Sequence, residues 1–128
     1  MATALELHRA GWRSYVENVR PRPGRPALAA PEAAERAEVL TRVREAVRQL
    51  KEAFPLKRVI LFGSLAHQGW FITDSDVDLA VAGLSSGDYW KAWRLLEDAV
   101  GLRPVDLLEL ETVGASLRQA IERYGIEL

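Results

Sequence analysis

Two aspartates, Asp76 and Asp78, interrupt an apolar run that otherwise has the composition of a buried strand. An ionised carboxylate inside such a run is costly unless it is paired or binds a cation. Side chains alternate between the two faces of a strand, so Asp76, Asp78 and Ala80 are expected on one face, opposite Val77 and Leu79. The two aspartate Cα atoms then lie about 6.5–7 Å apart. Their oxygens can converge on a hard cation such as Mg²⁺.

A third aspartate, Asp106, interrupts the apolar segment R-P-V-D-L-L-E-L in the same way, and Glu109 is a weaker rival in that segment. If this strand lies beside that of Asp78, three carboxylates meet at one point. A site that holds two metal ions about 3.5–4 Å apart needs such a third carboxylate. Other interpretations stay open: charge at a strand end, a structural calcium site, or Asp106 on the solvent face of an edge strand.

Gly63 and Ser64 follow the first apolar run and supply a complementary feature. A glycine directly after a strand lets the backbone approach a ligand closely. If residues 64–69 begin a helical turn, its free amides favour phosphate oxygens, and the Ser64 hydroxyl adds a donor. A Gly-Ser pair is uninformative alone, but beside a carboxylate cluster it suits phosphoryl or nucleotidyl transfer.

The elements that must position these residues can be read from hydrophobic periodicity and from breaking residues. The pattern predicts an α/β (α+β) fold in which a small mixed β-sheet is backed by helices, in the order ααββαβα. We expect helices at 2–19, 32–53, 89–100 and 113–124, strands at 56–62, 75–82 and 103–110, and a short tail after Gly125.

Several segments have both a structural and a functional interpretation. The apolar side of helix 2–19 could pack on the domain or be offered to a partner. The segment P-R-P-G-R-P at 21–26 breaks any helix and is a solvated connector or a phosphate or RNA contact. Interleaved Arg and Glu predict a salt-bridged solvent face on helix 32–53. The stripe containing Trp90 and Trp93 favours core packing over base stacking.

The overall composition limits the class of protein. At 128 residues we expect a single domain over 1–128, with an N-terminal helix and Pro/Arg loop at 1–31 and the core at 32–128. The absence of cysteine excludes disulfides, thiolate nucleophiles and zinc-thiolate sites. A net charge of -1 gives no global argument for binding nucleic acid or membranes. Without a signal peptide or an apolar span, a cytoplasmic protein is expected.

The arrangement F-G-S-x(11)-D-V-D-L-A-V resembles the signature of the DNA polymerase β-like nucleotidyltransferase superfamily, specifically the minimal nucleotidyltransferases. The resemblance covers roughly residues 56–128. It implies that Gly63 and Ser64 contact the triphosphate of ATP or another nucleoside triphosphate. It also implies that Asp76 and Asp78 ligate two Mg²⁺ ions, and that Asp106 completes the metal site and takes the proton from the acceptor hydroxyl.

The chain departs from the family in the loop after Gly-Ser. His67 stands where many relatives have arginine, and no Lys or Arg lies between Arg58 and Lys91. Charge compensation for a triphosphate must therefore come from metal, from a remote arginine or from a partner chain.

The resemblance also suggests a partner, because minimal nucleotidyltransferases are often encoded beside a HEPN protein. In such pairs the HEPN protein can be an RNase toxin, and the transferase an antitoxin that attaches AMP to it. We therefore expect transfer of a nucleoside monophosphate, AMP from ATP, to a hydroxyl of a HEPN-type partner. The alternatives are an antitoxin that acts by contact alone and a transferase acting on an antibiotic or sugar. Homo-oligomerisation through a sheet edge or the Trp-bearing surfaces stays open.

Overall fold

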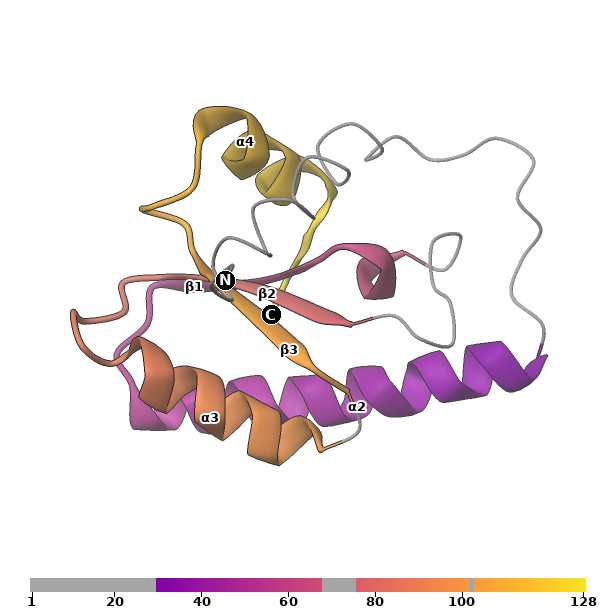
Figure 1. Ribbon diagram of the computed structural model, residues 1–128. Coiled ribbons are helices and arrows are strands. Elements are labelled where there is room, and N and C mark those ends of the chain that lie inside the picture. Colours follow the sequence, from indigo (N-terminus) through magenta and orange to yellow (C-terminus); the bar gives the residue numbers. More distant parts are fainter. Residues whose placement is uncertain (1–29, 68–75, 102) are drawn as a thin grey trace, which may run out of the picture.

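The structure is a computed structural model that describes residues 30–67, 76–101 and 103–128 (Figure 1). Its elements are α2 (Ala30–Ala53), β1 (Arg58–Phe62), the 3₁₀ turn η1 (Ser64–Ala66), β2 (Val77–Ala82), α3 (Tyr89–Val100), β3 (Val105–Glu109), α4 (Ala115–Tyr124) and β4 (Ile126–Glu127). The helix expected at 2–19 and the Pro/Arg loop at 21–26 lie outside the described residues.

The four strands form one mixed sheet in the order β3-β2-β1-β4. Strand β1 runs antiparallel to both β2 and β4, whereas β2 and β3 are parallel. A parallel pair needs a crossover connection, and α3 supplies it between β2 and β3. The expected mixed sheet backed by helices is therefore confirmed.

The fourth strand corrects the predicted element order, in which the residues after Gly125 form a tail. Ile126 and Glu127 instead pair with Leu61 and Ile60 of β1. The backbone amide of Leu128 donates to the Val59 carbonyl at 2.9 Å and continues the pairing. A two-residue strand is too short to show the alternation from which strands are recognised in a sequence.

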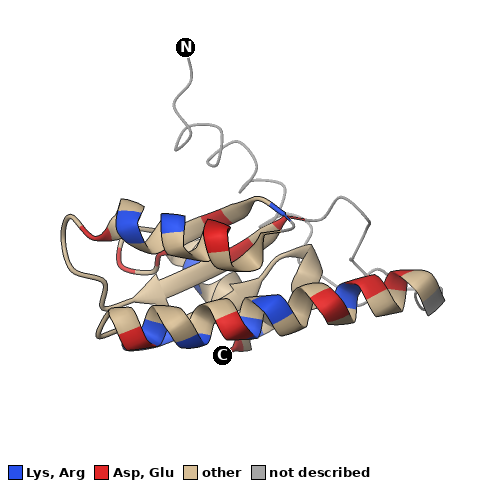
Figure 2. Cartoon of the chain, turned by 90° about the horizontal axis from the view of Figure 1, so that it is seen from below, with Lys and Arg blue, Asp and Glu red and all other residues tan. Residues whose placement is uncertain are grey.

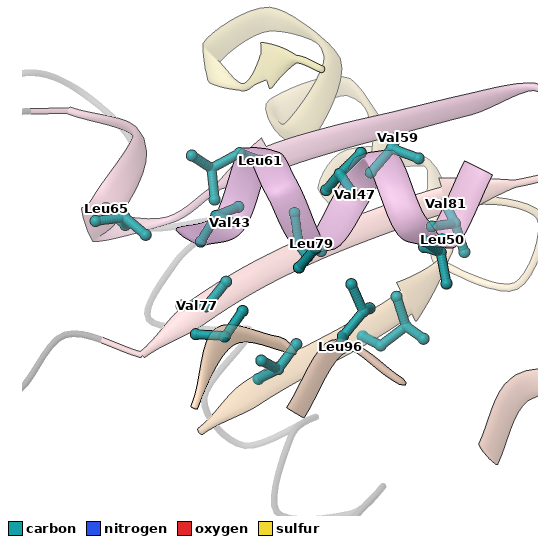
Figure 3. Packing of buried hydrophobic residues seen from close by; sticks show 14 of the residues in the cluster. Val43, Val47, Leu50, Val59, Leu61, Leu65, Val77, Leu79, Val81 and Leu96 are labelled. Atoms are coloured by element: carbon teal, nitrogen blue, oxygen red, sulfur yellow. The ribbon is translucent and has the colours of Figure 1, made fainter. Parts of the chain in front are cut away.

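Helices α2 and α3 cover one face of the sheet and bury the larger of two apolar clusters (Figures 1 and 3). Strand β2 contributes Val77, Leu79 and Val81 to this cluster, and none of the three is exposed. This is the apolar face that strand alternation predicts for β2. Helices α2 and α3 add Val43, Val47, Leu50, Ala92, Leu96 and Val100.

Helix α4 covers the opposite face with a smaller cluster. Ala80, the residue expected on the aspartate face of β2, is fully buried here among Ile60, Phe62, Leu108 and Ile121. The sheet is thus covered on both faces, which explains why its strands are nearly continuous apolar runs. Asp78 lies one alternation beyond Ala80 on this same face, at the end of the cluster.

The outer surface of α2 carries both signs of charge along its length (Figure 2). Arg48 pairs with Glu45 and Glu52, and Arg42 pairs with Glu38, so the predicted salt-bridged face is confirmed at these positions. The expectation of a buried aromatic stripe on α3 is wrong for Trp90, which is 64% exposed. No helix in the described part of the chain is both long and apolar enough to span a bilayer.

Candidate active site

Asp78 and Asp106 are direct neighbours across the parallel strands β2 and β3. Adjacent strands lie about 4.8 Å apart, and paired residues project their side chains to the same face. The two carboxylates share a hydrogen bond, and both side chains are partly buried. The predicted meeting of these two aspartates therefore follows from strand register. Glu109, the rival to Asp106, projects to the opposite face because it is three residues further along β3.

The electrostatics of this pair are unfavourable when both groups are ionised. Burial raises the pKa of Asp78 well above its ordinary value, and repulsion from the Asp106 carboxylate adds to the effect. A hydrogen bond that the protonated Asp78 carboxyl donates to Asp106, and the charge of Asp76, act in the same direction. The two carboxylates together present a set of hard oxygen donors. Such donors suit Mg²⁺, which would relieve their repulsion.

Asp76 is placed differently from the other two aspartates. The strand begins at Val77 rather than at the expected Ser75, so Asp76 lies just before β2 and is exposed. Its charge reaches Asp78, as the pKa of that carboxyl shows. Within the described ranges, however, no group of three His, Asp or Glu side chains is close enough to hold a metal ion. The structure therefore joins Asp78 to Asp106 and leaves Asp76 beside them.

Gly63 closes the other side of the Asp78 carboxylate. Its φ of +76° favours glycine, and a Cβ at this position would collide with Asp78 Oδ2 and lie 3.1 Å from Asp78 Cγ. The residue before it, Phe62, pairs with Asp78 across β1 and β2. Gly63 is predicted to leave space for a ligand. In the structure, the space that its missing Cβ leaves is occupied by the Asp78 carboxylate.

The turn η1 follows directly, with Ser64 partly buried and Leu65 and Ala66 buried. The amides of Ala66 and His67 donate to the Gly63 and Ser64 carbonyls at 3.2 and 3.4 Å. The expected helical turn at 64–69 is confirmed as a single 3₁₀ turn over 64–66, and residues 68 and 69 lie outside the described part. Gly63 and Ser64 therefore lie beside the aspartate pair, as expected.

Three residues around the site were not identified from the sequence. Arg36, expected on the solvent face of α2, is partly buried, and its Nε donates to the Leu65 carbonyl at 3.1 Å. His67 Nε2 donates to the Tyr124 carbonyl at the end of α4, at 2.5 Å. The Tyr89 hydroxyl donates to the Leu107 carbonyl at 2.6 Å. Burial, with the nearby charges of Asp106 and Glu109, raises the pKa of Tyr89.

No local pattern would have revealed these three contacts. Arg36 is one of several arginines interleaved with glutamates, and His67 has no second histidine or cysteine beside it. Each contact joins residues that are distant in the chain, by 29 positions for Arg36 and Leu65 and by 57 for His67 and Tyr124. Long-range contacts of this kind depend on the packing of whole elements.

Comparison with known proteins bears on what the site does. The family model for the polymerase beta nucleotidyltransferase domain matches residues 45–128, which include both strands of the aspartate pair and the Gly63-Ser64 turn. The chain belongs to the polymerase β nucleotidyltransferase family. It is therefore a transferase of nucleotidyl groups, of the minimal nucleotidyltransferase type.

Solved structures place this nucleotidyltransferase among small relatives. A minimal nucleotidyltransferase of known structure is 29% identical, with a TM-score of 0.60 over 73% of this chain and 95% of that one. A mutant of the toxin–antitoxin complex MntA–HpeT is 26% identical, with a TM-score of 0.56 over 66% and 69% of the two chains. A toxin–antitoxin structure with AMP-PNP is 27% identical, with a TM-score of 0.55 over 65% and 69%. A search of curated proteins found no match.

Proposed function

We propose that this nucleotidyltransferase transfers AMP from ATP to a hydroxyl group of a HEPN-type partner protein and thereby acts as an antitoxin. One observation carries the proposal: the Asp78 and Asp106 carboxylates are register partners on adjacent parallel strands, with Gly63 against Asp78. Two partly buried carboxylates that repel each other are unfavourable when both are ionised, and a site of this kind is suited to receive a cation.

Asp76, Asp78 and Asp106 are the residues that would hold Mg²⁺. When bound, Mg²⁺ supplies Lewis-acid polarisation of phosphoryl oxygens and lowers the pKa of the acceptor hydroxyl. Gly63 and Ser64 would contact the triphosphate, because Gly63 lies against Asp78 and Ser64, which carries a hydroxyl, begins the turn that follows it. These roles follow the family resemblance, residue by residue.

The reaction is an in-line displacement at the α-phosphorus of ATP. The acceptor oxygen forms a bond to the α-phosphorus, the bond between that phosphorus and the bridging oxygen of the β-phosphate breaks, and pyrophosphate leaves. Asp106 accepts the proton of the acceptor hydroxyl.

The partner is proposed from the relatives. Two of the similar structures are toxin–antitoxin complexes, and one of them was solved with AMP-PNP, an ATP analogue. That context supports a protein acceptor and an adenine nucleotide for this chain.

The test uses ATP labelled at either the α- or the γ-phosphate, with Mg²⁺ and any HEPN-type protein that is found to co-purify with the chain from its host. We expect label on the partner from α-labelled ATP only, because the γ-phosphate leaves with pyrophosphate. Asp78→Asn is expected to abolish labelling, whereas the matched control Asp98→Asn, on the exposed side of α3, is expected to retain it. Label from γ-labelled ATP, or none from any nucleoside triphosphate, would contradict the proposal.

A second candidate is an antitoxin that neutralises its partner by contact alone. It is favoured by the absence of Lys and Arg between Arg58 and Lys91, since the turn has no basic side chain of its own for a triphosphate. In that case neutralisation survives the double change Asp76→Asn and Asp78→Asn. Turnover with an antibiotic or sugar, and without a protein partner, would instead indicate a small-molecule acceptor.

A further inference from the structure

Arg36 connects helix α2 to the turn beside the aspartate pair. Its Nε donates to the carbonyl oxygen of Leu65 at 3.1 Å, across 29 positions of the chain. Leu65 is the middle residue of η1, directly after Gly63 and Ser64, and its side chain is fully buried. The guanidinium thus holds the backbone of the turn from the α2 side of the sheet.

This contact differs from the other arginine contacts of α2. Arg42 and Arg48 pair with carboxylates of the same helix. Among the described residues, the acceptor of Arg36 is a main-chain carbonyl instead. Partial burial and the nearby Arg44 cation lower the pKa of Arg36, and no carboxylate acts in the other direction. An arginine stays protonated in proteins, so its positive charge lies beside the turn without compensation from a described acidic group.

The neighbouring residue on α2 has a related role. Glu35 forms an ion pair with Arg103, two residues before β3, and the Arg103 side chain is 9% exposed. Two consecutive residues of α2 therefore contact the segments on either side of the aspartate pair, the turn after β1 and the start of β3. Both Glu35 and Arg36 lie outside the residues that the family model matches, 45–128.

The sequence segment that contains the turn and strand β2 has no lysine or arginine side chain of its own. No Lys or Arg occurs between Arg58 and Lys91, and Arg58 itself pairs with Glu122 and Glu127 at the other end of β1. A triphosphate seated at the turn needs positive charge near it, and a nearby cation is worth most where water is partly excluded.

We propose that Arg36 is a positioning residue: it fixes the turn that receives the triphosphate and supplies the positive charge that the turn itself lacks. The proposal rests on the proposed function, in which Gly63 and Ser64 contact the triphosphate. It adds a residue from α2 to a site that the family signature confines to the sheet and its loops.

The test compares Arg36→Gln, Arg36→Lys and the matched control Arg44→Gln, which removes the same charge from an exposed position of the same helix. Binding of ATP is measured by titration calorimetry without acceptor, and KM and kcat by transfer to the partner. We expect Arg36→Gln to raise both the Kd and the KM for ATP about tenfold with kcat unchanged. Arg36→Lys should recover part of the loss, and Arg44→Gln should match the wild type.

A second measurement separates this role from a purely structural one. The loss in Arg36→Gln should be largest for ATP, smaller for ADP and least for AMP, and it should shrink at high salt, because screening weakens a charge interaction. A structural role alone would lower the melting temperature and leave the KM of the folded protein unchanged.

Two results would overturn the proposal and are distinguishable. If wild type transfers AMP but Arg36→Gln has the KM of Arg44→Gln, the role of Arg36 is refuted and the proposed function stands. If wild type neither binds ATP nor labels any acceptor, the proposed function fails and this inference fails with it.

Discussion

The Asp78 carboxylate lies between Gly63 at the end of β1 and Asp106 on β3, and both neighbours constrain it. Gly63 limits its space, while Asp106 and burial raise its pKa. A group whose pKa is raised on folding binds its proton more tightly in the folded state than in the unfolded one. It therefore opposes folding at every pH above its unfolded value of about 3.9.

The first prediction is that Asp78→Asn stabilises the protein at neutral pH in the presence of a chelator. The folded state of the wild type binds more protons than the unfolded state between the two pKa values, so its stability falls as pH rises through that window. The asparagine side chain does not ionise, so the stability of the variant does not fall in this way as pH rises. Its melting temperature should exceed that of the wild type by about 3 °C or more at pH 7.5. The difference should disappear near pH 4.

Thermal unfolding followed by circular dichroism at several pH values measures this difference. Asp98→Asn, an exposed aspartate with no such neighbours, is the control and should show no comparable gain. A variant less stable than the wild type at pH 7.5 would show that the Asp78 environment is not strained.

The second prediction concerns Gly63 and uses Gly87 as its control. Both have positive φ, +76° and +88°, but a Cβ at Gly87 meets nothing within 4 Å. Gly87→Ala should cost about 1–2 kcal/mol of unfolding free energy from backbone strain alone. Gly63→Ala should cost distinctly more, because its Cβ also displaces the Asp78 carboxylate, and it should abolish transfer.

Urea unfolding gives both free energies. Adding Asp78→Ala to Gly63→Ala removes the colliding oxygen, so this second change should recover part of the loss. Equal costs for the two glycine substitutions would refute the close contact between Gly63 and Asp78.

At the scale of elements, side chains of α3 form hydrogen bonds with backbone groups on the outer edge of β3. Trp93 Nε1 donates to the Val105 carbonyl at 2.9 Å, and the Tyr89 hydroxyl donates to the Leu107 carbonyl. In the other direction, the Val105 amide donates to Glu97 Oε1 at 2.8 Å. These bonds occupy backbone groups that an edge strand would otherwise offer to another chain. Dimerisation by strand addition at β3 is disfavoured for this reason.

The third prediction tests this edge with two tryptophans of one helix. Trp93→Phe keeps most of the ring but removes the donor to Val105, which should cost about 1 kcal/mol of unfolding free energy. Trp90→Phe changes an exposed ring with edge contacts to Tyr89 and Trp93 and should cost less than about 0.5 kcal/mol. Equal costs in urea unfolding would contradict the role of the indole donor.

The elements differ in how well their sequences predict them. Helix α3 matches the prediction at both ends, and β2 and β3 are each predicted two residues too early at their starts, because apolar periodicity marks a core better than a boundary. Strand β4 is not predicted, because two residues are too few to show the alternation of apolar and polar side chains that marks a strand. The Asp78–Asp106 pairing was predicted from the two interrupted strands, whereas the Arg36 contact depends on how α2 lies across the sheet, which no local pattern encodes.

At the scale of the whole molecule, a sheet between two helical layers leaves the carboxylates at one end of the smaller core. That core contains Ile60, Phe62, Ala80 and Leu108, so the apolar environment that raises the Asp78 pKa belongs to the fold itself. Binding of a divalent cation there is therefore coupled to the stability of the domain.

The fourth prediction is that Mg²⁺ raises the melting temperature of the wild type. A ligand at 100 times its Kd adds about 2.7 kcal/mol to the unfolding free energy. Scanning calorimetry over a Mg²⁺ titration should show a rise that saturates. The double variant Asp76→Asn, Asp78→Asn should show none, and KCl at equal ionic strength should not reproduce it. A rise of the same size in the double variant would place the cation elsewhere.

The contact between Gly63 and Asp78 also has an evolutionary consequence. A glutamate at position 78 would extend one methylene further toward the space that Gly63 leaves open, just as any side chain at position 63 would displace the carboxylate. The two positions, 15 apart in the sequence, are therefore expected to covary among homologues. Among homologues that place a larger residue at the position of Gly63, the aspartate partner should have been lost, and such chains would retain the fold while giving up the chemistry.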